Sequence, residues 1–267
     1  MKKLLEYIPE ENGSRAAWAR ERIRPFREYT LQTIVPAGFA KYVRLCQPAW
    51  RWPEIDPQDA QAFANIASGQ YGWEHATQVR WSQVASETGN TAHRLMQWYA
   101  IAPPPWEPGE GGISAPIEYE ITPQMVTALF DILIDFFGKQ QECLCAFWEG
   151  YADQEELLAA KNTRVSGLGQ QSYFLFHAPL ASVQAQWLAV LADRWETSGL
   201  APNAVWPTSE EWYYSVPIGP HTSYLGGPAE LVDAIRSCTE LETYEAFPLD
   251  DIWRDPLNPP VREDPPN

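Results

Sequence analysis

Residues 122–148 read TPQMVTALFDILIDFFGKQQECLCAFW, and this stretch decides the fold class. Thr122 followed by Pro123 is typical of a helix start, because the hydroxyl accepts an amide hydrogen bond and proline suits the first turn. The broad apolar set predicts a buried helix that runs to Phe137 and stops at the glycine that follows. The apolar run at 143–148 then predicts a buried strand. A helix is therefore expected to pack on a sheet.

Strands and helices alternate on both sides of this stretch. Downstream we predict strands at 173–177, 212–218, 223–225 and 243–247 and helices at 181–197 and 229–236. Upstream we predict helices at 14–23, with Ser14 as N-cap, at 59–67 and at 80–88. The runs at 30–35 and 40–45 indicate two strands or a strand and a bend, and we favour a hairpin. No βαβ series with a glycine-rich first turn is present. The expected fold is α+β, an antiparallel or mixed sheet with helices packed on it, in a single domain or two closely packed lobes.

Proline and charge divide the chain further. Pro103, Pro104, Pro105 and Pro108 lie close together and favour a linker. The predicted parts are a basic N-terminal helical segment (1–29), an N-terminal lobe (30–101), a Pro/Gly-rich linker (102–121), a C-terminal α+β lobe (122–250) and a Pro-rich acidic tail (251–267).

The composition of the chain limits which partners and which cellular compartment are expected. The chain has 267 residues and is 45% hydrophobic, so it should fold. Its net charge of -16 should prevent binding to the phosphate backbone of nucleic acid. No apolar run approaches the ~20 residues of a membrane helix, so no membrane partner is expected. The first residues lack the apolar core of a signal peptide, which predicts a cytoplasmic protein. The four cysteines are too scattered for a disulfide scaffold and are interpreted as reduced thiols.

Catalytic motifs of the G-x-S-x-G, S-x-x-K and H-E-x-x-H types are missing from the sequence. A run of tryptophan, glutamate, glycine and tyrosine at 148–151 follows the predicted buried strand. Its carboxylate can face a cleft between aromatic rings, as in sugar-active proteins, or the run can simply form a turn at the strand end. The thirteen tryptophans can likewise line such a cleft or fill a core. The candidate ligand-binding residues are Trp148, Glu149, Tyr151, His177, Trp206 and Trp212.

A metal site has one weak set of candidate ligands. Cys143 and Cys145 share one face of a predicted strand, and His177 lies on a later strand, so the three can offer soft ligands to zinc. The alternative is two buried thiols that pack as small hydrophobic groups. The spacing differs from that of a zinc knuckle, so we expect no metal and no cofactor.

Several blocks carry a resemblance to known proteins. They are the runs at 202–207 (PNAVWP), 222–227 (TSYLGG), 80–85 (RWSQVA) and 147–151 (FWEGY). In these blocks the chain resembles a family of bacterial proteins common in actinomycetes, to which no activity is assigned. The resemblance spans residues 36–247. It implies a bacterial, cytosolic protein and transfers no catalytic residue.

These observations favour a non-enzymatic acidic protein-binding module, immunity-like or regulatory, with another protein as its partner. The reasons are the charge, the missing catalytic motifs and the abundance of tryptophan and tyrosine, which are enriched in interface hot spots. The partner can also be another copy of the same chain, in a homo-oligomer. The alternative function is an enzyme or a small-ligand binder with a Trp-lined cleft.

Overall fold

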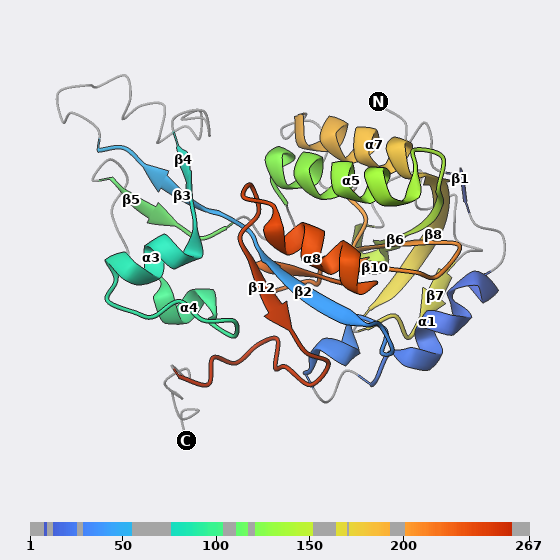
Figure 1. The fold of residues 1–267 in the computed structure, drawn as a ribbon, viewed down its shortest axis with the longest axis horizontal. Helices are drawn as coiled ribbons and strands as arrows, with labels where there is room; N and C mark the ends of the chain where they lie inside the picture. Colours follow the sequence, from blue (N-terminus) through green and yellow to red (C-terminus); the bar gives the residue numbers. More distant parts are fainter. Residues whose placement is uncertain are drawn as a thin grey trace.

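The computed structural model describes residues 8–9, 13–25, 29–54, 76–103, 111–116, 121–151, 164–169, 171–192 and 201–257. It has a large lobe built on one long sheet and a small lobe built on a three-stranded sheet (Figure 1). The expected α+β class with an antiparallel sheet is confirmed, since every described strand pairing is antiparallel. No helix in these ranges is long and apolar enough to cross a membrane.

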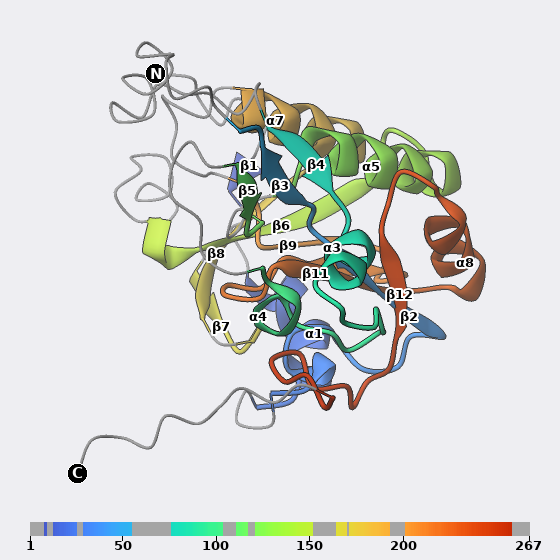
Figure 2. The same ribbon diagram turned by 90° about the vertical axis from the view of Figure 1, so that its left-hand side faces the viewer.

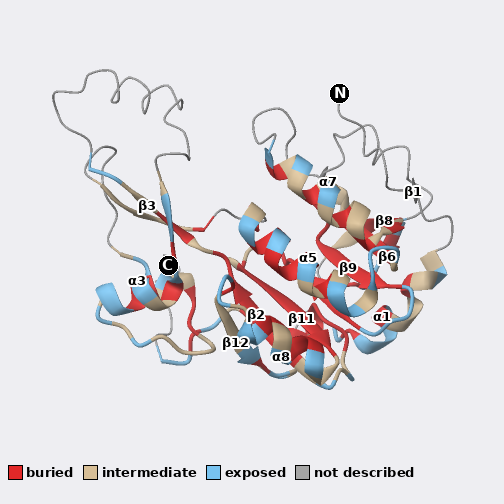
Figure 3. Ribbon diagram, turned by 45° about the horizontal axis from the view of Figure 1, so that its top comes forward, coloured by how far each residue is buried: buried red, intermediate tan, exposed pale blue. Residues whose placement is uncertain are grey.

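The large sheet joins strands from nearly the whole chain. Its order is β1 (Ile8–Pro9), β8 (Ser172–Pro179), β6 (Glu142–Trp148), β9 (Ala204–Pro207), β10 (Tyr213–Ser215), β11 (Thr222–Gly227), β2 (Lys41–Cys46) and β12 (Thr243–Ala246), with β7 (Arg164–Ser166) also paired to β8. Figure 3 shows β2 and β11 buried along their length, as their side chains face layers on both sides. Strands covered on both faces read as continuous apolar runs, which is why the run at 143–148 predicts a strand without alternation.

Helices on opposite faces of the large sheet make two cores. α5 (Pro123–Phe137), α7 (Leu180–Ala192) and α8 (Ala229–Ser237) cover one face, and α1 (Ala17–Arg22) with the turn η3 (Leu31–Thr33) covers the other (Figure 2). β6 shows the division residue by residue. Cys143, Cys145 and Phe147 pack under α5 and α7, whereas Leu144 and Ala146 pack on the opposite side.

α5 forms as its sequence predicts. The Thr122 hydroxyl accepts a hydrogen bond from the Met125 amide at 3.3 Å, and the chain leaves the helix at Gly138, whose φ is 84°. The buried face of the helix places Phe130 against Trp187 of α7, with ring centroids 5.6 Å apart. The capping residue and the apolar stripe are both visible in the local sequence, so this helix can be predicted without knowing its tertiary contacts.

The small lobe begins where β2 runs on into β3. Its sheet has the order β4 (Thr77–Val79), β3 (Ala49–Trp52) and β5 (Gly112–Ser114), and α3 (Trp81–Glu87) and α4 (Trp98–Ile101) pack beside it. Trp81 is fully buried, and its ring centroid lies 5.7 Å from that of Trp98. A core of its own makes this a separate packing unit on the same chain.

Three upstream expectations differ from the structure. The predicted hairpin is wrong: residues 31–33 form the turn η3, and β2 pairs with β11 and β12 from the end of the chain. Ser14 does not cap a helix, because it lies inside a 3-10 turn (Gly13–Ala16) and α1 begins after Ala16. The expected helix at 59–67 and much of the expected linker lie outside the described residues, but 112–114 form β5, so the lobes divide between β2 and β3 and not at residue 102.

Residues 247–257, which we call the C-terminal strap, follow β12 and run along the lower edge of the molecule in Figure 1. The strap ties together both lobes. The Leu31 amide of the large lobe donates to the Asp250 carbonyl oxygen at 2.9 Å. The Asp250 carboxylate forms an ion pair with Arg94 of the small lobe, and the Asp255 amide donates to the Tyr99 hydroxyl at 2.9 Å.

Candidate functional site

The run at 148–151 forms the end of β6 and the 3-10 turn η5 (Glu149–Tyr151). The Glu149 carboxylate forms an ion pair with Arg164 of β7 at 2.9 Å and accepts a hydrogen bond from the Arg164 guanidinium at 3.2 Å. The Trp148 ring folds over Gly150, where any Cβ atom would come within 2.3 Å of it. Glu149 is thus held in an ion pair beside the strand, and the Tyr151 side chain lies outside the described residues.

Replacing Glu149 with glutamine is expected to change the free energy of unfolding by less than about 1 kcal/mol. Arg164 is 58% exposed and Glu149 is 35% exposed, so water screens most of their attraction. Urea denaturation of the two proteins measures the difference. A loss of several kcal/mol would instead show that the carboxylate has a buried structural role.

Trp206 and Trp212 lie in the two cores and not in a common cleft. Both are fully buried. Trp206 packs under α1 with its ring stacked on Tyr213, whereas Trp212 packs on the opposite face beside Phe137 of α5. The sheet itself therefore separates these two predicted ligand-binding residues.

The candidate metal ligands also point to different faces. Cys143 and Cys145 share one sheet face, as predicted, but His177 is paired with Leu144 and shares its face, which is the opposite one. His177 is hydrogen-bonded through Nδ1 to the Glu142 carboxylate at the start of β6. In the part of the chain that the structure describes, no three His, Cys, Asp or Glu side chains are grouped to hold a metal ion.

Burial governs the chemistry of the cysteines. All four are thiols, and only Cys238 has partial exposure. Burial raises the pKa of Cys46 to about 12 and raises the pKa of Cys143 above its ordinary value. A raised pKa lowers the thiolate fraction, and the thiolate is the nucleophile.

At about pH 8 we therefore expect iodoacetamide to modify native Cys238 well before Cys46 or Cys143. Mass spectrometry after timed quenching reads out each site. Alkylation in denaturant, where all four thiols are accessible, is the control. Early modification of Cys143 in the native protein would contradict its placement in the core.

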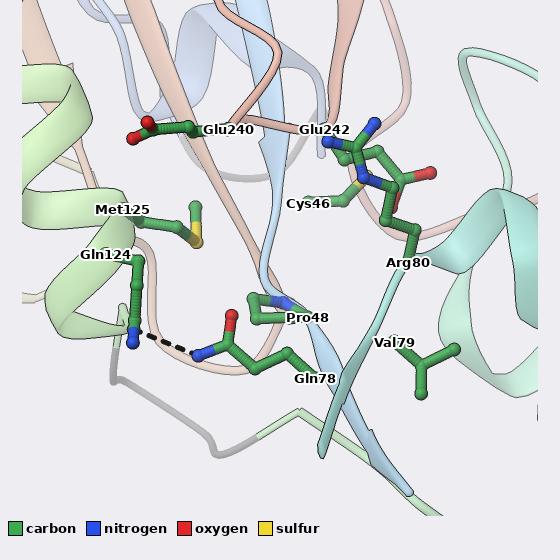
Figure 4. Close-up of a pocket in the computed structure, with 9 residues that line it drawn as sticks. All are labelled: Cys46, Pro48, Gln78, Val79, Arg80, Gln124, Met125, Glu240 and Glu242. Atoms are coloured by element: carbon green, nitrogen blue, oxygen red, sulfur yellow. Dashed lines mark hydrogen bonds between the residues drawn. The ribbon is translucent and has the colours of Figure 1, made fainter.

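A cavity of about 130 Å³ lies at the junction of the lobes (Figure 4). The small lobe contributes Gln78, Val79 and Arg80, and the first turn of α5 contributes Gln124 and Met125. The remaining walls are Cys46, Pro48, Glu240 and Glu242. Gln78 donates to the Gln124 side chain at 3.0 Å, so the rim is itself a contact between the lobes.

Two charged groups of the cavity also have structural roles. The Glu242 carboxylate accepts the amide hydrogens of Trp81 at 2.6 Å and Ser82 at 2.8 Å, so it caps α3 from the large lobe. Arg80 donates to the Thr239 carbonyl oxygen. A volume of about 130 Å³ is well below the ~300–1,000 Å³ of most ligand pockets. The cavity is better explained as imperfect packing between two lobes.

The strap and its neighbours expose apolar side chains. Six large hydrophobic side chains in the described ranges are exposed: Tyr29, Tyr99, Phe136, Phe247, Leu249 and Leu257. Three of them belong to the strap, and two more come from segments that it contacts. The Ile252 amide donates to the Tyr29 carbonyl oxygen at 3.1 Å, and the Tyr99 hydroxyl accepts from the Asp255 amide. We call these five side chains the strap surface.

The chain matches no protein-family model, and comparisons with curated proteins and with solved structures give no significant match. Function must therefore be argued from the residues. Among the features described, the predicted ligand-binding residues are dispersed and the cavity is small, whereas five of the six exposed apolar groups lie on the strap or on segments that it contacts.

Proposed function

We propose that this protein is a protein-binding module and that the strap surface is its contact surface. The observation that carries the proposal is the exposure of Leu249 (68%) and Leu257 (65%) on a strap that also exposes the Phe247 ring and hydrogen-bonds to Tyr29 and Tyr99. Three half-exposed rings alone leave roughly 300 Å² of apolar area in water, given ~150–250 Å² per aromatic side chain. An apolar area of this order falls within the ~300–600 Å² of the largest apolar patch on an ordinary monomer, and such a patch is often functional.

The anatomy of the strap surface supports this reading. Interface centres are apolar and aromatic, and their rims carry charged groups. The strap surface combines tyrosine, phenylalanine and leucine side chains, and Arg254 and Asp251 lie on the strap between Leu249 and Leu257. Arg94 stacks on the Phe247 ring, with its guanidinium carbon 4.7 Å from the centroid, and so holds that ring in place before any partner arrives.

The net charge contributes less to this proposal than the sequence alone suggests. Of the described residues, seventeen are acidic and thirteen are basic, so most of the net charge of -16 resides in the other segments. Steering by a broadly acidic fold surface is therefore a weaker argument than apolar contact. We also propose a bacterial, cytoplasmic setting for the module; this rests on the sequence resemblance alone, and none of the comparisons bears on it.

Site-specific photo-crosslinking in the native host tests the proposal. We expect a benzophenone side chain at position 257 or 249 to form a covalent adduct with another polypeptide. The same group at Phe136, which is 45% exposed on α5, should form none. Equal adducts at both places, or none at the strap, would contradict the strap surface as the contact surface.

A further inference from the structure

We propose that the partner at the strap surface is a second copy of this chain, in a two-fold symmetric dimer. This inference rests on the proposed function and adds the identity of the partner. A two-fold interface uses the same patch on both subunits, so the patch must complement itself. An apolar centre with charges of both signs around it meets that requirement.

The charges of the strap are of mixed sign. Arg254 is 73% exposed and lies only 4.0 Å from Asp251, at the limit of an ion pair. Glu245, just before the strap, is exposed. In a two-fold pair, Arg254 of one copy can meet Glu245 or Asp251 of the other, and the reverse contact follows by symmetry. A surface for a strongly basic or strongly acidic partner would carry one sign.

The residues that follow the strap directly in the chain offer little apolar area to cover the strap surface. Residues 258–267, which follow it directly, include Val261 as their one large apolar residue, against five exposed side chains on the surface. Nucleic acid and an anionic membrane are disfavoured by the net charge of -16.

Repulsion between two acidic copies is limited for a physical reason. The excess of acidic over basic residues among the described positions is only four, and salt screens exposed charges beyond about 8 Å at physiological ionic strength. Apolar contact, which salt does not weaken, would hold the copies together. The dimer should therefore persist as salt rises.

Sedimentation velocity of the full chain over a wide concentration range is the test. We expect a concentration-dependent dimer whose dissociation constant rises about tenfold or more in the double variant Leu249→Glu, Leu257→Glu. Phe136→Glu is the matched control: it adds one charge at an exposed apolar site on α5 and should dimerise like the wild type. Far-ultraviolet circular dichroism of each variant checks that it is folded.

Hydrogen exchange of the wild-type protein gives a readout that needs no variant. Amides of residues 247–257 should lose protection on dilution, while amides of α5 should not. A wild type that stays monomeric at every concentration, or a dimer unaffected by the double variant, would overturn the second copy as partner. Adducts to a different host protein at position 257 would leave the protein-binding proposal standing, whereas no strap adduct at all would remove both.

Discussion

The Trp206→Ala protein is expected to unfold with a free energy about 3–5 kcal/mol lower than that of the wild type. Trp206 is fully buried, and its ring stacks on Tyr213 with centroids 5.2 Å apart and planes 20° apart. Removing the indole takes away this contact and leaves a cavity that the surrounding sheet and α1 cannot fill. Since folded domains are stable by only ~5–15 kcal/mol, this is a large fraction of the total.

Urea denaturation followed by circular dichroism measures the loss of stability. Phe136→Ala is the control, because this half-exposed ring on α5 should cost no more than about 1 kcal/mol. A Trp206→Ala protein as stable as the Phe136→Ala protein would place Trp206 outside the core. It would then return to the set of candidate ligand-binding residues.

Arg44→Met is expected to lower the free energy of unfolding by about 2 kcal/mol or more. Arg44 is 2% exposed, and its guanidinium donates to the carbonyl oxygens of Arg94 at 2.8 Å and Met96 at 2.6 Å. It also lies over the Trp81 ring, 5.4 Å from the centroid. Methionine keeps the apolar stem but leaves both carbonyl groups without this donor, which outweighs the relief of no longer burying a charge.

The matched control is Arg51→Met in β3. Arg51 pairs with Glu87, but the two side chains are 41% and 39% exposed, so the loss should stay below about 1 kcal/mol. Because Arg44 joins β2 to the small lobe, tryptophan fluorescence should report a disturbed Trp81 in the Arg44 variant only. Equal stabilities of the two variants would contradict a structural role for the buried guanidinium.

Elements whose signals are local could be predicted from the sequence. Thr122 and Gly138 mark the ends of α5, and the apolar runs of β6 and β8 give buried strands. β2 was also found, but its neighbours were not, because they lie near residues 222–227 and 243–246. No local pattern specifies which strand pairs with which across such distances.

The candidate site was harder to predict than the fold for the same reason. Glu149 and Arg164 are paired, and so are His177 and Glu142, but each pair joins different elements and no spacing rule links its members. The strap surface does have a signal in the sequence. Phe247, Leu249 and Leu257 are large apolar residues among prolines and acidic residues, where a solvated segment would need none.

The pairing of β2 between β11 and β12 has a consequence for synthesis on the ribosome. β2 leaves the ribosome long before its partners, because the strands on both its sides come from residues 222–246. Glu242, which caps α3 of the small lobe, arrives equally late. The nascent chain must therefore keep both edges of β2 unpaired until residues 222–246 have been made, so a chaperone that shields such edges would matter most for this protein up to that point.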